Sequence, residues 1–110
     1  PDGTKVWLNS SSRVEYAASF FSRKRRVKMD GEAYFEVSHD RHAPFVVSTN
    51  GLDIRVLGTR FNIRNDAQKH LVTTVLLEGS VEASVTGERG AALRLRPSQQ
   101  LLFHTDTKDM

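Results

Sequence analysis

The sequence predicts an all-β domain, a jelly-roll-like antiparallel β-sandwich of about ten short strands. No stretch of about ten residues keeps apolar side chains at the helical spacing i, i+3, i+4 and i+7. Alternating apolar and polar stretches recur about every eight to twelve residues, with turn residues between them. The dipeptides Asp30-Gly31 and Asn50-Gly51 are typical of the type I′ turns that close tight hairpins.

Two hairpins are predicted in the N-terminal half. The first joins residues 26–29 to 32–37 through Asp30-Gly31, and the second joins 45–49 to 52–57 through Asn50-Gly51. Alternation also predicts earlier strands at residues 5–9 and 13–17.

In the C-terminal half, Gly58 interrupts a strand pattern and predicts a bulge or a bend. Strands are expected at residues 71–77, 80–86, 92–96 and 99–103. We expect one domain over residues 1–103, followed at residues 104–110 by a tail or the start of a linker to a further C-terminal domain. The predicted core comprises Val6, Leu8, Phe35, Val37, Phe45, Val47, Phe61, Val75 and Leu77.

Composition excludes several classes of site. The 110 residues are 38% hydrophobic and 26% charged, which is typical of a globular domain. The chain has no cysteine, so disulfides and zinc–thiolate sites are excluded. No apolar run in the given residues approaches the ~20 needed to cross a bilayer, and none of them has the pattern of a signal peptide.

The formal charge of +3 comes from one short basic segment, Arg23, Lys24, Arg25, Arg26 and Lys28. Without these five cations the remaining charge is 11 − 13 = −2. A phosphate-binding patch is one interpretation, but no stacking aromatics alternate with the charges. A solvated strand is favoured over nucleic-acid binding, and an acidic protein partner is a further candidate.

A search for catalytic or metal-binding residues finds no complete set. His39 and His42 stand close in sequence, but no third or fourth ligand accompanies them. Glu32 and Glu36 would lie about 13 Å apart on one strand, beyond the ~5–9.5 Å of a glycosidase pair. Trp7 and Tyr34 are the large aromatics expected outside the core, where a carbohydrate-binding module would use them for stacking.

Two motifs carry a family resemblance, residues 31–37 (GEAYFEV) and 56–62 (VLGTRFN). Five further segments, each shorter or less specific, follow the same order along the chain: residues 1–9, Phe20 with Arg26-Val27, 44–47, 78–81 and 95–100. Together they resemble the periplasmic domain of FecR-type transmembrane sensors, which are anti-sigma regulators, and look most like members from Bacteroidetes-type bacteria. Met29 and Ser98 depart from the family pattern, and Ser98 replaces a common turn glycine.

The resemblance implies a non-enzymatic signalling module without cofactor or metal, in the periplasmic part of a single-pass inner-membrane protein. Its implied partners are the N-terminal signalling domain of a TonB-dependent outer-membrane transporter and, through a separate N-terminal segment, an extracytoplasmic-function sigma factor. The family offers no catalytic residues to transfer. Exposed strand edges are the first candidates for contact with a partner, and the basic segment is the second. A carbohydrate-binding β-sandwich is the alternative function, and a small β-barrel enzyme is the third.

Overall fold

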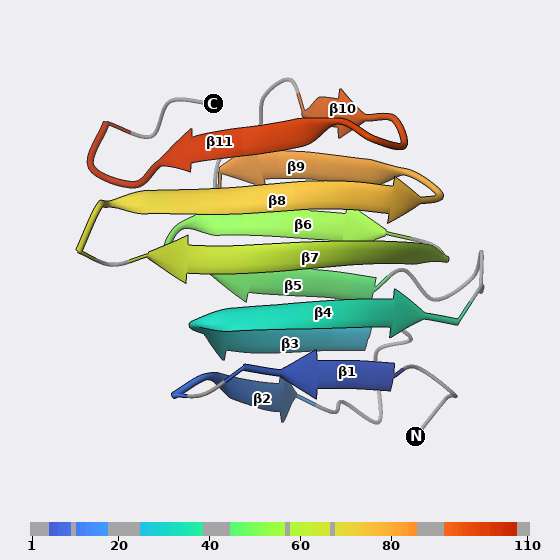
Figure 1. The fold of residues 1–110 in the computed structure, drawn as a ribbon, viewed down its shortest axis with the longest axis horizontal. Helices are drawn as coiled ribbons and strands as arrows, with labels where there is room; N and C mark the ends of the chain where they lie inside the picture. The colour runs from blue at the N-terminus through green and yellow to red at the C-terminus, as the bar shows by residue number, and fades with distance from the viewer. Residues whose placement is uncertain are drawn as a thin grey trace.

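The protein is described by a computed structural model over residues 5–9, 11–17, 25–38, 45–56, 58–66, 68–85 and 92–107. Eleven strands in these residues form two sheets that pack face to face (Figure 1). No described residue lies in a helix, and so none of the described chain forms a helix able to cross a membrane. The predicted all-β sandwich is confirmed.

The front sheet of Figure 1 has five antiparallel strands in the order β1-β4-β7-β8-β11. They are β1 (Lys5–Leu8), β4 (Glu32–Val37), β7 (Thr59–Asp66), β8 (Leu71–Glu78) and β11 (Gln100–His104).

The back sheet has six strands in the order β10-β9-β6-β5-β3-β2. They are β2 (Arg13–Ala17), β3 (Arg25–Asp30), β5 (Phe45–Thr49), β6 (Leu52–Val56), β9 (Val81–Val85) and β10 (Leu93–Leu95). The β3–β5 pair is parallel, and every other pair is antiparallel. In both sheets the strand order follows the sequence, so the chain advances from the β1/β2 end of the sandwich to the β10/β11 end.

The Asn50-Gly51 hairpin is confirmed. Thr49 lies opposite Leu52, and β5 and β6 are antiparallel neighbours. Asn50 and Gly51 have φ values of 45° and 90°, the two positive angles that a type I′ turn requires.

The prediction of a hairpin at Asp30-Gly31 is wrong, although Gly31 has the expected positive φ of 87°. The turn carries the chain from β3 in the back sheet to β4 in the front sheet. A hairpin would place Met29 opposite Glu32 on one face, but Met29 is buried and Glu32 is only half-buried. The apolar residues of β3 and β4 can all be buried only if the two strands lie in different sheets and face each other across the core.

Two further turns shape the front sheet. Gly58 lies in a bend between β6 and β7, where the chain crosses from the back sheet to the front, as its place in the pattern predicts. Ser98 has a φ of 74°, so it adopts the left-handed conformation that suits glycine in the turn before β11.

The core lies between the sheets, and five predicted members are confirmed as buried: Phe35, Val37, Phe45, Val47 and Phe61. Phe35 stacks on Phe61 of the front sheet, with ring centroids 5.0 Å apart and planes 10° apart. It meets Phe45 of the back sheet edge-on at 6.2 Å. This aromatic cluster therefore joins the two sheets.

The prediction of burial is wrong for the other four core candidates. Val6 and Leu8 lie opposite Phe35 and Ala33, so they face inward, but β1 is an edge strand and they are 38% and 50% exposed. Val75 is half-buried and Leu77 is 52% exposed, because β8 buries its other face. A register shift between Arg60 and Phe61 leaves Leu77 as the extra residue of a bulge.

Candidate interaction surface

The two outer faces of the sandwich differ in polarity. On the front sheet, Trp7, Leu77 and Leu102 are exposed on the outer face, and Val6 and Leu8 are exposed on the inner side of the edge strand β1. Leu93, in the short back-sheet strand β10, is the remaining large apolar side chain that the described residues expose to solvent. An exposed apolar face is typical of a surface that meets another protein.

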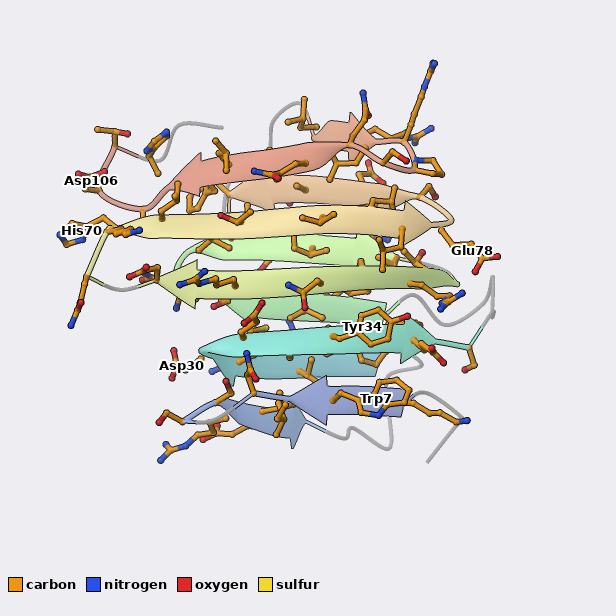
Figure 2. The ribbon with its side chains drawn as sticks, in the orientation of Figure 1. Trp7, Asp30, Tyr34, His70, Glu78 and Asp106 are labelled. Carbon is orange, nitrogen blue, oxygen red and sulfur yellow. The ribbon has the colours of Figure 1, made fainter. Side chains whose placement is uncertain are left out.

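An aromatic pair lies on the outer face of β1 and β4. Trp7 and Tyr34 are direct cross-strand neighbours, and both side chains lie on the front of the sheet in Figure 2. Their ring centroids are 5.3 Å apart, and their planes are tilted by 46°. Half of the Trp7 surface is exposed. Because the rings are not coplanar, they form an angled apolar corner and not a flat platform for stacking a sugar.

The hydroxyl of Tyr34 is held by charged neighbours. It accepts a hydrogen bond from Arg60 Nε at 3.0 Å and donates one to Glu36 Oε1 at 3.2 Å. Arg60 also lies 3.6 Å from Glu36 and 3.5 Å from Glu78. The hydrogen bond to Tyr34 raises the pKa of Arg60. This network therefore fixes the Tyr34 ring on the sheet and keeps a permanent cation beside it.

A second polar group lies at the other end of β4. The Glu32 carboxylate accepts hydrogen bonds from Asn62 Nδ2 at 3.0 Å and from Asn9 Nδ2 at 2.6 Å. These bonds lower the pKa of Glu32. A general acid of glycoside hydrolysis needs a raised pKa, so Glu32 is unsuited to that role. Glu36 has different partners, and the two carboxylates form no pair.

The basic segment is only partly described by the structure. Arg23 and Lys24 lie outside the described residues, as do His39 and His42. Arg25 is described by its backbone alone, at the start of β3.

Arg26 and Lys28 project from the outer face of the back sheet, and neighbours of opposite charge accompany them. Arg26 forms an ion pair with Asp53 at 3.2 Å. Lys28 lies opposite Glu15 of β2. The described part of the segment is therefore a mixed-charge surface, which is less suited to binding a phosphate backbone than a continuous cationic patch.

Within the described ranges, no group of three His, Asp or Glu side chains converges on a point that could hold a metal ion. The depressions found among the described residues are open, and both polar and apolar groups line them. The largest described one has a volume of about 550 Å³ and lies where Lys5, Glu36, Arg60 and Glu78 meet at one end of the front sheet.

Residues 1–82 match the model of the FecR protein family. The chain belongs to the FecR family. Two crystal structures of a protein from Parabacteroides distasonis that is designated an anti-sigma factor are similar to this FecR domain, each with 34% identity and a TM-score of 0.86. The match covers 99% of this chain and 50% of that protein, so the chain spans half of its length. No curated protein matches the chain.

The FecR family is a regulatory class and not an enzymatic one, which draws attention to the surfaces of this FecR domain and away from any catalytic cleft. The network around Arg60 was missed by sequence analysis. Its residues come from three strands, and Arg60 and Tyr34 are 26 positions apart. No local sequence pattern reports such a cross-strand pairing, which depends on register.

Proposed function

We propose that this domain is a non-enzymatic signalling module in the periplasmic region of a transmembrane anti-sigma regulator. It relays the state of a TonB-dependent outer-membrane transporter to a cytoplasmic sigma factor through protein–protein contacts. The observation that carries the proposal is 34% identity, over 99% of the chain, to half of a protein designated an anti-sigma factor. The sigma factor would be bound by a separate N-terminal segment of the same regulator.

The distribution of apolar residues supports a role in protein contact. The outer face of the front sheet exposes Trp7, Leu77 and Leu102 and carries a fixed polar network, whereas the outer face of the back sheet carries paired charges. Aromatic side chains and arginine are enriched at the centres of protein interfaces. Tyr34 and Arg60 combine both types at one place.

A binding experiment tests the proposal. The complete periplasmic region is mixed with the N-terminal signalling domain of the transporter, and the affinity is compared with that of a region lacking residues 1–103. We expect the deletion to weaken binding and to disturb a sigma-factor-dependent reporter in cells. If the remaining C-terminal part binds and signals normally, the domain is a spacer and the contact role is wrong.

Carbohydrate binding is the second candidate, because Trp7 is half exposed beside Tyr34. A glycan array probed with the wild type and Trp7→Ala tests it. Glycan binding that the Trp7→Ala variant loses would favour the second candidate over the first. The 46° tilt between the rings favours the signalling role.

A further inference from the structure

We propose that the outer edge of β1, which no described strand pairs, is the docking site for an extended strand of a partner protein, which adds to the five-stranded front sheet. This inference rests on the proposed function and names the element that makes the contact.

Backbone hydrogen bonds alternate along β1, so the N–H and C=O groups of two of its residues point away from β4. Asn9 donates its backbone N–H to the carbonyl of Glu32 at 3.0 Å. Bonded and non-bonded residues alternate along an antiparallel ladder, so Trp7, two residues earlier, also bonds to β4. Val6 and Leu8 therefore point their N–H and C=O groups to the free side, where no described strand pairs with β1.

The side chains of β1 are apolar on both faces of the strand. Val6 and Leu8, on the inner face, are 38% and 50% exposed, and Trp7 on the outer face is 50% exposed. Lys5, at one end, is the one charged residue of the strand. Apolar residues on both faces are typical of strands that are covered on both faces.

The other three edges differ from β1 in charge, length or apolar exposure. In β2, Arg13 and Glu15 place charges along the edge of the back sheet. The β10 strand has only three residues. In β11, the exposed Leu102 lies between the exposed polar residues Gln100 and His104. Natural proteins protect edges with charges and short strands. Neither β1 nor β11 has much of this protection, but β1 alone of the two exposes large apolar side chains on both faces, Val6 and Leu8 inward and Trp7 outward.

The geometry selects an extended chain as the occupant. A partner residue opposite Val6 and another opposite Leu8 would each exchange two backbone hydrogen bonds, as in any antiparallel pair. The partner residue between them would lie on the outer face against Trp7. We therefore expect a strand with apolar side chains at these positions and an acidic residue near Lys5.

A second copy of this chain fits the edge less well. Two copies joined through four-residue strands would bury far less than the about 800 Å² per partner of a stable interface. Each copy also carries a formal charge of +3. A single strand from a different protein needs only the edge, and the contact would be weak enough to reverse during signalling.

A proline substitution tests the edge without touching the ladder to β4. Leu8→Pro removes an N–H that points to the free side, and proline is tolerated at such edge positions. Leu102→Pro is the matched control. It changes the same residue type, 42% exposed, on the opposite edge of the same sheet. Thr105 donates its N–H to His70 O, so by the same alternation Leu102 also points outward.

The complete periplasmic region is titrated with the signalling domain of the transporter by calorimetry. We expect Leu8→Pro to weaken binding about tenfold or more, and Leu102→Pro to change it less than about twofold. Leu8→Lys and Leu102→Lys repeat the comparison with the N–H retained, in case proline impairs folding. Hydrogen exchange gives a direct readout, because the amides of Val6 and Leu8 should gain protection on binding and that of Leu102 should not.

Three results would overturn the inference. If the wild type binds and the Leu8 variants bind equally well, the edge is wrong and the proposed function stands. If the wild type does not bind, the proposed function fails and the inference falls with it. If sedimentation shows a dimer that Leu8→Pro abolishes, the edge takes a second copy and the stated occupant is wrong.

Discussion

Replacing Phe35 with alanine should be among the most damaging single changes in this domain. Phe35 is fully buried and touches aromatic rings from both sheets, Phe61 at 5.0 Å and Phe45 at 6.2 Å. Deleting a buried phenylalanine costs about 3–5 kcal/mol. Each aromatic pair adds about 0.5–1.5 kcal/mol beyond the buried area, so we expect the upper half of that range, about 4–5 kcal/mol.

The effect is large against the whole stability of a domain, which is about 5–15 kcal/mol. With a urea m-value of about 2 kcal/mol/M, the midpoint should fall by roughly 2 M. Circular dichroism follows the transition, because Trp7 is too exposed to report on the core. Phe35→Leu keeps most of the volume and should cost about 1–2 kcal/mol. A cost below about 1 kcal/mol for Phe35→Ala would refute the packing of this ring between the sheets.

The remaining predictions concern turns and one carboxylate. Gly31→Ala should destabilise more than Gly51→Ala in chemical denaturation: both have positive φ, but a Cβ at Gly31 would meet Ser12 Cα at 2.9 Å, whereas Gly51 has open space. Equal losses would contradict this. Ser98→Gly should raise the unfolding free energy by about 0.5–1 kcal/mol, because glycine relieves the left-handed strain at 74°; an unchanged midpoint would show that the turn is unstrained. The pKa of Glu32 is lowered in the folded state, so its stabilisation is present above pH 4.5 and is lost as the pH falls through the folded-state value. Thermal unfolding between pH 3 and 6 should therefore depend less on pH in Glu32→Gln, and parallel curves would count against this role.

The fold class was predictable because alternation and turn residues are local signals. Asn50-Gly51 is the clearest case, because the residues paired across the turn match in polarity: Val47 and Ile54 are both apolar, and Ser48 and Asp53 are both polar. The same comparison of polarity across the turn would have excluded a hairpin at Asp30-Gly31. Its flanking residues do not match, because the apolar Met29 would face Glu32.

The inward face of β8 could not be predicted in this way. Apolar residues occupy both faces of the strand, and Thr74 is buried where a leucine or valine would be expected. Its hydroxyl has no hydrogen-bond partner in the described structure. Period-2 alternation is absent here, so only packing decides the direction.

The polar cluster on the front sheet was unpredictable for a different reason. It depends on the register of β4 against β7, which brings Glu36 opposite Arg60 and Glu32 opposite Arg64. Sequence alone gives the candidates but not the pairing, because a shift of one residue would move each side chain to the other face.

The order of the strands in the front sheet has a mechanical consequence. The front sheet has β1 at one edge and β11 at the other, so tension applied between these two strands acts across the sheet. Such tension loads the bonds of a ladder one after another, as in a zipper, and not all together. The β1–β4 ladder has four residue pairs, whereas β7 and β8 are paired over nearly their whole length at the centre. Under load β1 would peel first and leave the aromatic core closed, so tension could release one strand without unfolding the domain.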